Sequence, residues 1–199
     1  MSANILADVR VLWPNLFVPK GIPGSPEAPA KFSCVVLFPT PEIVRPVLKE
    51  LGRAMVEKHG EPAAKAALAA FTNGGRQPMK HWPIRRCDEI EDSALTEFDG
   101  WWARLSANTT YPPVVVDRRA QPVLDQTLIY SGCYCNVDFN AFGWSHPTGG
   151  KGVSLGLRAV QFVRPGDRIG GAGGHKFGAL DDNDDAPPDN GSAFDDVMG

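Results

Sequence analysis

Alternating apolar and polar positions run through most of this chain and predict a protein built mainly of β-strands. Between the alternating stretches stand prolines and glycines, which mark turns and loops. The predicted strands are Ile5–Trp13, Lys31–Phe38, Trp101–Asn108, Val114–Asp117, Leu128–Trp144 and Lys151–Val163. Asn15–Ala30 contains four further prolines after Pro14, so we expect it to be a long loop.

Helical spacing occurs in one region only, between the second and third predicted strands. Thr40 and Pro41 are suited to the N-cap and first position of a helix that runs to about His59, where Gly60 ends it. Pro62–Phe71 is rich in alanine and predicts a second, shorter helix. The two helices form a helical insertion at about residues 41–71, and residues 72–100 are expected to be irregular.

The segment Leu128–Trp144 has two faces of different character. Its odd positions, including Cys133, Cys135 and Phe139, are small or apolar and should face the core, whereas its even positions are polar or aromatic. In the last strand the alternation changes phase, which predicts a bulge near Ala159. Five or six strands with long hairpins and a helical insertion fit a small barrel better than a sandwich.

Length and composition suit one compact domain of 199 residues, of which 43% are hydrophobic. No apolar run reaches 18 residues, and the start has no basic stretch followed by an apolar one. We therefore expect neither a membrane partner nor a secretory signal, and a cytoplasmic location. The four cysteines should then be free thiols.

Charge divides the chain into a basic body and an acidic end. All 20 Lys and Arg residues precede residue 179, together with 16 of the 23 acidic residues, so the body carries +4 and the end −7. We predict a folded domain over residues 1–167, a glycine-rich linker over 168–178 and a disordered acidic tail over 179–199. Such a charge division is typical of proteins that handle polyanions, although acidic tails also serve as solubilising appendages.

Motifs for enzymatic chemistry are missing from the sequence. It contains no nucleotide-binding, metalloprotease or hydrolase signature, and the glycine run at 170–174 precedes no helix. The acidic run Asp88–Asp92 could hold a divalent ion, but a solvated loop is the simpler interpretation. Cys133 and Cys135 lie too close for a usual zinc site, so we expect buried thiols and no cofactor or metal.

The functional hypothesis that accounts for the most residues rests on a set of outward-facing aromatic rings that alternate with basic side chains. Single-stranded nucleic acids are bound by cations that meet phosphates and by rings that stack on bases. Any one of these rings could instead be a packing residue. The candidate DNA-binding residues are Lys31, Trp82, Arg85, Arg86, Trp102, Arg104, Tyr130, Tyr134, Phe142, Trp144, Lys151 and Arg158.

The blocks Tyr130–Tyr134 and Gly150–Leu157, with Val160 and Gln161, resemble a family of tailed-phage single-stranded DNA-binding proteins formerly catalogued as a domain of unknown function. The likeness extends to the early strands, the helix after Pro41 and the acidic tail. It implies an OB-fold barrel that binds single strands without sequence preference during phage DNA replication, recombination or repair. Self-association along DNA is left open.

The same resemblance suggests a role for the tail, which would compete with DNA and recruit replication partners. The residues proposed for this are Asp181, Asp182, Asp184, Asp185, Phe194, Asp195 and Asp196. Two alternatives remain from the residues alone. One is a phage interaction or scaffold module without nucleic-acid binding, and the other is a magnesium-dependent nuclease that uses Asp88–Asp92.

Overall fold

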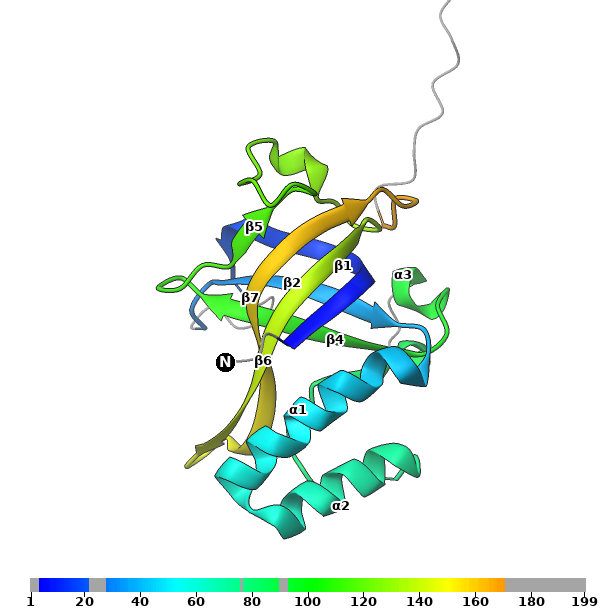
Figure 1. The fold of residues 1–199 in the computed structure, drawn as a ribbon. Helices are drawn as coiled ribbons and strands as arrows, with labels where there is room; N and C mark the ends of the chain where they lie inside the picture. Colours follow the sequence, from blue (N-terminus) through cyan, green and yellow to red (C-terminus); the bar gives the residue numbers. More distant parts are fainter. Residues whose placement is uncertain (1–3, 22–27, 76, 90–92, 171–199) are drawn as a thin grey trace, which may run out of the picture.

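Five strands form a closed ring in the computed structural model, which describes residues 4–21, 28–75, 77–89 and 93–170 (Figure 1). The ring runs β1 (Asn4–Lys20), β2 (Lys31–Phe38), β4 (Trp101–Asn108), β7 (Gly150–Arg164) and β6 (Tyr134–His146) and returns to β1. Every pairing is antiparallel except β4 with β7, which is parallel. This order is that of an OB-fold barrel and confirms the predicted fold class.

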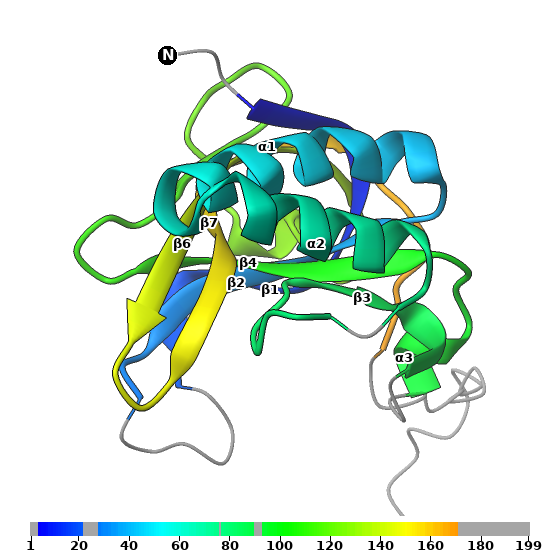
Figure 2. The same cartoon turned by 90° about the horizontal axis from the view of Figure 1, so that it is seen from below.

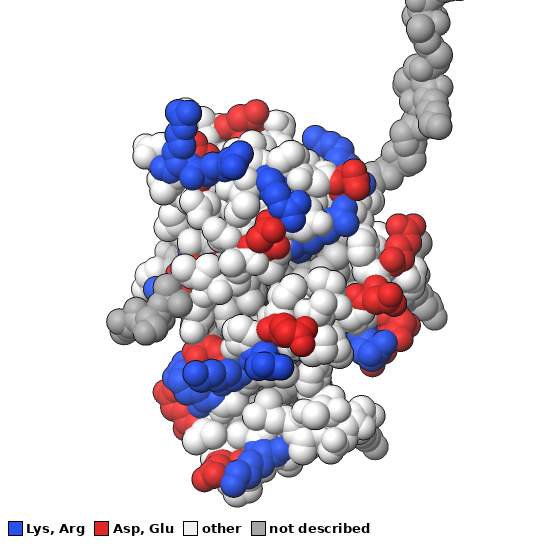
Figure 3. Space-filling model, turned by 45° about the vertical axis from the view of Figure 1, so that its right-hand side comes forward, with Lys and Arg blue, Asp and Glu red and all other residues white. Residues whose placement is uncertain are grey.

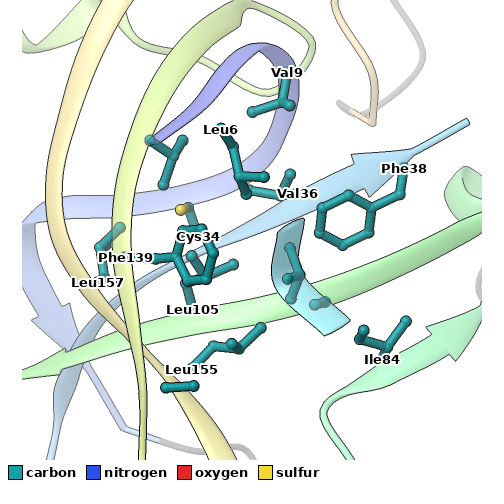
Figure 4. Close-up of a cluster of buried hydrophobic side chains, with 14 of the residues drawn as sticks. Leu6, Val9, Cys34, Val36, Phe38, Ile84, Leu105, Phe139, Leu155 and Leu157 are labelled. Atoms are coloured by element: carbon teal, nitrogen blue, oxygen red, sulfur yellow. The ribbon is translucent and has the colours of Figure 1, made fainter. Parts of the chain in front are cut away.

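The interior of the barrel is filled by aliphatic side chains that surround one central phenyl ring. Phe139 of β6 is fully buried and lies among Leu6, Cys34, Leu105 and Leu157 (Figure 4). The predicted inward face of β6 is confirmed, since Cys133, Cys135, Val137, Phe139 and Ala141 are all buried. The strand itself begins later than predicted, at Tyr134, because Gly132 adopts a φ of +109° that breaks the extended backbone.

The helical insertion closes one end of the barrel. Helix α1 (Pro41–His59) buries Val44, Val47, Leu51 and Met55 against the ring, chiefly against β6 (Figures 1 and 2). Helix α2 (Glu61–Thr72) packs on α1 and buries Ala64 and Ala67. Both helices occupy the predicted region, and Gly60 separates them with a φ of +86°.

Strand β1 differs from the prediction in length and in phase. It continues through Pro14 and Pro19 to Lys20, where a loop was predicted, because both prolines lie in irregular stretches of the β1–β2 register. A second irregularity, between Leu6 and Val9 opposite β6, shifts the alternation, so that Leu6 faces the core and Ile5 faces outward. Single-sequence alternation cannot detect either bulge.

The bulge predicted near Ala159 is confirmed. Asp138 lies opposite Ala159 and Phe139 opposite Leu157, so Arg158 is the extra residue of β7. Beyond this bulge β5 (Val114–Val116) pairs with β7 in parallel. The short elements β3 (Ile84–Arg86), η1 (Cys87–Glu89), α3 (Ser93–Thr96) and η2 (Gln126–Leu128) complete the described part.

A second, smaller apolar cluster covers part of the outer face of β1, β2 and β4. Leu12, Val35 and Leu37 meet Cys87, Leu95 and Ile169 there, with Trp13, Phe98 and Trp102 at the edge. Residues 168–170 were predicted to belong to a flexible linker. Ile169 is instead buried, and its backbone N–H donates to the Ser131 carbonyl at 3.0 Å.

None of the helices in the described ranges is long and apolar enough to cross a membrane.

Gly132 provides a test of how the chain end is fastened to the barrel. A Cβ at this position would overlap the Asp167 carbonyl oxygen, and its φ of +109° is strained for any other residue. We expect Gly132→Ala to lower the free energy of unfolding by about 2–4 kcal/mol.

Gly74→Ala is the matched control, because Gly74 also has a positive φ, +65°, but its added Cβ meets nothing within 4 Å. The control should lose only about 1–2 kcal/mol. Equal losses for the two variants in urea-unfolding experiments would contradict the overlap as a cause.

Candidate nucleic-acid interface

The outward side chains of β4 form a polar strip on the outside of the barrel. Arg104, Ser106 and Asn108 alternate with the buried Ala103, Leu105 and Ala107. Across the β2–β4 ladder the strip continues, with Ser33 opposite Ser106 and Lys31 opposite Asn108. The two serines are small, so the middle of the strip is a shallow depression. Basic side chains border it.

A groove of about 510 Å³ lies along this strip, between β4, β7 and the chain that leads into β3. Arg104 and Ser106 line one side, Ser154 and Leu155 of β7 the other, and Arg85 with Trp102 one end. His81, Trp82 and Pro83 complete the wall. No carboxylate is among these lining residues, so within the described chain the groove is positively charged.

Trp144 adjoins the groove through two of the residues that line it, Ser154 and His81. Its indole N–H donates to the Ser154 hydroxyl at 2.9 Å, and its ring lies 5.0 Å from the His81 ring. A side chain at Gly152 would run into both Trp144 and His81, so this glycine allows the two rings to approach. The indole is thus half-buried and held in one orientation.

The basic side chains around the groove are not neutralised by carboxylates in the part of the chain that the structure describes. The ion pairs found there involve other cations: Arg53, Lys65, Arg86, Arg158 and Arg164. Lys31, Arg85, Arg104 and Lys151 are therefore available to a polyanion. On the side of the molecule in Figure 3, by contrast, basic and acidic side chains are interspersed.

Trp102 lies at one end of the groove and belongs both to the groove and to the second apolar cluster. One part of the ring packs into the second apolar cluster, and the Arg85 guanidinium lies 6.0 Å from the ring centroid. The side chain is half-buried and still lines the groove, so Trp102, Arg85 and Arg104 are brought to one surface. Trp144 adjoins this surface through Ser154, and Lys31 lies opposite Asn108 on the strip. Lys151 is exposed at the start of β7 but is not among the residues that line the groove.

Trp82 was predicted to be an exposed ring and this is wrong. Only 8% of the residue is exposed, and its ring packs 6.0 Å from that of Phe71 at the end of α2. The basic residues after it made this loop appear solvent-exposed in the sequence. Trp82 instead fastens the helical insertion to the sheet and touches the groove only at its edge.

Tyr130 and Tyr134 lie away from the groove, each with an arginine on one ring face. The Arg168 guanidinium lies 4.2 Å from the Tyr130 centroid, and that of Arg164 3.4 Å from the Tyr134 centroid. Tyr130 also donates its hydroxyl proton to the Gly166 carbonyl at 2.9 Å. The structure therefore uses both rings to fasten the chain segment after β7.

Sequence reasoning missed these arginines and also Arg10, which donates to the Gly132 and Asp167 carbonyls. The sequence held a weak signal for their role, since Arg164 and Arg168 lie in the short segment that follows the last predicted strand.

Three further candidates also lie outside the groove. Arg86 pairs with Asp88 at 3.0 Å and Arg158 pairs with Asp138 at 3.7 Å. Phe142 is 47% exposed but lines a separate depression with Arg53 and Lys58 of α1. These residues are outward, as predicted, without belonging to the same surface.

The cysteines and the acidic run take structural positions. All four cysteines are free and buried, and the Cys133 and Cys135 sulfurs lie 3.7 Å apart. Burial raises the pKa of Cys34 to about 12. The Arg86 guanidinium lowers the pKa of Asp88, and residues 90–92 lie outside the described residues. No group of three metal-ligating side chains occurs in the described ranges.

The acidic tail cannot be placed, because residues 171–199 lie outside the described residues. The predicted roles of Asp181, Asp182, Asp184, Asp185, Phe194, Asp195 and Asp196 therefore stay predictions.

Comparison with known proteins adds three findings. The family model described as the Enterobacter phage Enc34 ssDNA-binding protein matches residues 3–187. Protein p50 of Acyrthosiphon pisum secondary endosymbiont phage 1 is 30% identical over 182 residues, which cover 89% of this chain and 91% of the relative.

The fold is similar to that of the single-stranded DNA-binding protein from bacteriophage Enc34 in complex with ssDNA. That match has a TM-score of 0.65 at 17% identity and covers 83% of this chain and 88% of the other. A C-terminal truncation of the same protein gives a TM-score of 0.57 at 18% identity, over 82% of this chain and 86% of the other. The family match extends over nearly the whole sequence and confirms the resemblance, so this chain belongs to the family of the Enterobacter phage Enc34 ssDNA-binding protein.

Proposed function

We propose that this protein binds single-stranded DNA without sequence preference, and coats and protects it during phage DNA replication, recombination or repair in the cytoplasm of the host cell. The groove along β4 is the proposed site. Its role is binding rather than catalysis, and it needs no cofactor.

The observation that carries the proposal is the groove's combination of unneutralised cations and indole rings. Arg104 and Arg85 supply charge for phosphates along a floor that contains Ser106 and Ser154. Trp144, fixed by its hydrogen bond to Ser154, supplies a ring that has already lost its freedom to rotate. Cations that meet the backbone and rings that meet base faces bind every sequence alike. Family membership gives independent support.

A finer part of the proposal concerns the acidic tail. Seven aspartates follow residue 178, and the last described residue, Gly170, lies beside Arg10 and Arg168 at the barrel surface. If the 21 residues 179–199 behave as a flexible chain, as their composition predicts, they would reach about 25 Å, far enough to meet cations elsewhere on the body. We propose that the tail competes with DNA for the basic groove and, when displaced, docks replication partners.

Titration with fluorescent oligo-dT at several salt concentrations tests the proposed function. Affinity should fall with salt at a slope of about −0.7 per phosphate contacted. Arg104→Gln should weaken binding about 3- to 15-fold and reduce the slope by about 0.7, because one charge leaves the groove.

Arg158→Gln is the matched control, since Arg158 pairs with Asp138 away from the groove, and its affinity should stay within about twofold of the unchanged protein. Failure of the unchanged protein to bind oligo-dT at low salt would reject the proposed function.

Trp144→Ala tests the ring of the groove. Loss of base stacking should weaken oligo-dT binding by about 1–3 kcal/mol. Trp144→Phe keeps a ring and should lose less, while Ser154→Ala frees the indole and should give an intermediate loss. Thermal unfolding serves as the check, because a fall in affinity that follows only a fall in Tm would make Trp144 a packing residue.

Removal of residues 179–199 tests the tail. The truncated protein should bind oligo-dT several-fold tighter at low ionic strength, and the difference should shrink at about 0.3 M salt as charges are screened. A full-length variant with the seven tail aspartates changed to asparagine separates charge from length and should behave like the truncation. Unchanged affinity in both variants would refute competition without affecting the groove.

A further inference from the structure

Tyr111 is an exposed ring that the groove does not include and the sequence reasoning did not single out. In the described residues it is 76% exposed, whereas the tryptophans, Tyr130 and Tyr134 are half-buried or buried. A single exposed ring is common on protein surfaces, so its position relative to the groove decides what it means. Tyr111 lies in the connection after β4, three residues beyond Asn108.

The position of Tyr111 is fixed by the strip along β4. Its backbone N–H donates to the Asn108 side-chain oxygen at 3.0 Å, and Asn108 is the last outward residue of β4. Pro112 and Pro113 follow, and their fixed φ angles restrict the backbone. The backbone of Tyr111 is thus held in a stiff turn, which limits how far the side chain can move from the end of β4.

The surroundings of this turn are basic. Asn108 lies opposite Lys31 of β2, and Lys31 lies opposite Lys20 of β1. Neither lysine has a carboxylate partner among the residues that the structure describes. The loop after β4, the end of β1 and the start of β2 lie on one side of the barrel, on the left in Figure 1.

The turn at Tyr111, together with Lys20 and Lys31, forms a corner that continues the line of the groove. Arg104, Ser106 and Asn108 alternate outward along one strand, so Arg104 and Asn108 are about 13 Å apart. A backbone that meets Arg104 and follows β4 would leave the strip beside Lys31. Tyr111 lies in the turn that follows directly at the end of this strip, with its backbone held by Asn108.

Resting on the proposed function, we propose that Tyr111 is a stacking residue at the far end of the single-stranded DNA site. A base that has passed the β4 strip stacks on the phenol ring, and Lys20 and Lys31 meet the phosphates beside it. The corner extends the site beyond the groove, so only oligonucleotides long enough to span the strip reach it.

Oligo-dT binding by the full chain tests this inference, with lengths from about 4 to 20 nucleotides. For long oligonucleotides Tyr111→Ala should bind about 5- to 100-fold more weakly than the unchanged protein, the equivalent of one stacked base. Short oligonucleotides held by the groove alone should show no difference. Tyr111→Phe keeps the ring and should stay within about twofold at every length.

Leu124→Ala is the matched control, because Leu124 lies in the next connection, between β5 and η2, and is 93% exposed, yet has no place on the strip. It should bind like the unchanged protein. A loss in Tyr111→Ala that is equal at all lengths, or no loss at all, overturns the inference. If the unchanged protein itself does not bind oligo-dT, the proposed function fails instead.

Photo-crosslinking gives a readout that does not depend on folding of a variant. With 5-iodouracil placed at successive positions of a long oligo-dT, the peptide that contains Tyr111 should be labelled from positions near one end of the bound segment. Labelling of groove peptides at every position, with none at Tyr111, would overturn the inference.

Discussion

The short parallel contact between β4 and β7 is the constraint on which both the barrel and its site depend. Only Leu105 with Leu155 and Ser106 with Gly156 pair across it, so a narrow seam closes the ring. The backbone bridge between His81 and Gly152 lengthens the seam. Inward residues of this seam complete the core, while the outward ones form the floor of the groove. A side chain at Gly156 would overlap Asn140 of β6, so this position of the seam favours glycine.

The sequence was sufficient for the parts of the fold that local patterns govern. Strand β2, the helical pair, the inward face of β6 and the bulge at Arg158 follow from alternation, helical spacing and proline placement. The second half of strand β1 did not, because Pro14 and Pro19 predict a loop unless the irregular register of its pairing with β2 is known. The pairing with a distant strand determines the conformation of that segment, and such pairing cannot be seen in a single sequence.

The sequence predicted the kinds of side chain at the candidate site, cations and rings, but not which of them belong to it. Alternation shows which side chains point outward from a strand but not which other residues cover them. Trp82 stands in a basic loop yet is covered by Phe71 and α2. Arg86 and Arg158 look free in the sequence, but each meets a carboxylate. Arg104 and Lys31 have no such partner in the described chain, and the difference rests on neighbours distant in sequence.

The rings of this protein divide into two uses that composition cannot separate. Arginine guanidinium groups stack on Tyr130 and Tyr134 and fasten the segment that leads to the acidic end of the chain. Trp144 is oriented by the hydrogen bond from its indole N–H and packs beside the His81 ring, whereas Tyr111 is held through its backbone N–H only. No cation lies on either ring in the described structure. A ring held from its edge or its backbone keeps its face for a ligand, whereas a ring held by its face has one side already occupied. The way a ring is held therefore adds to its exposure in distinguishing a binding surface from a structural contact.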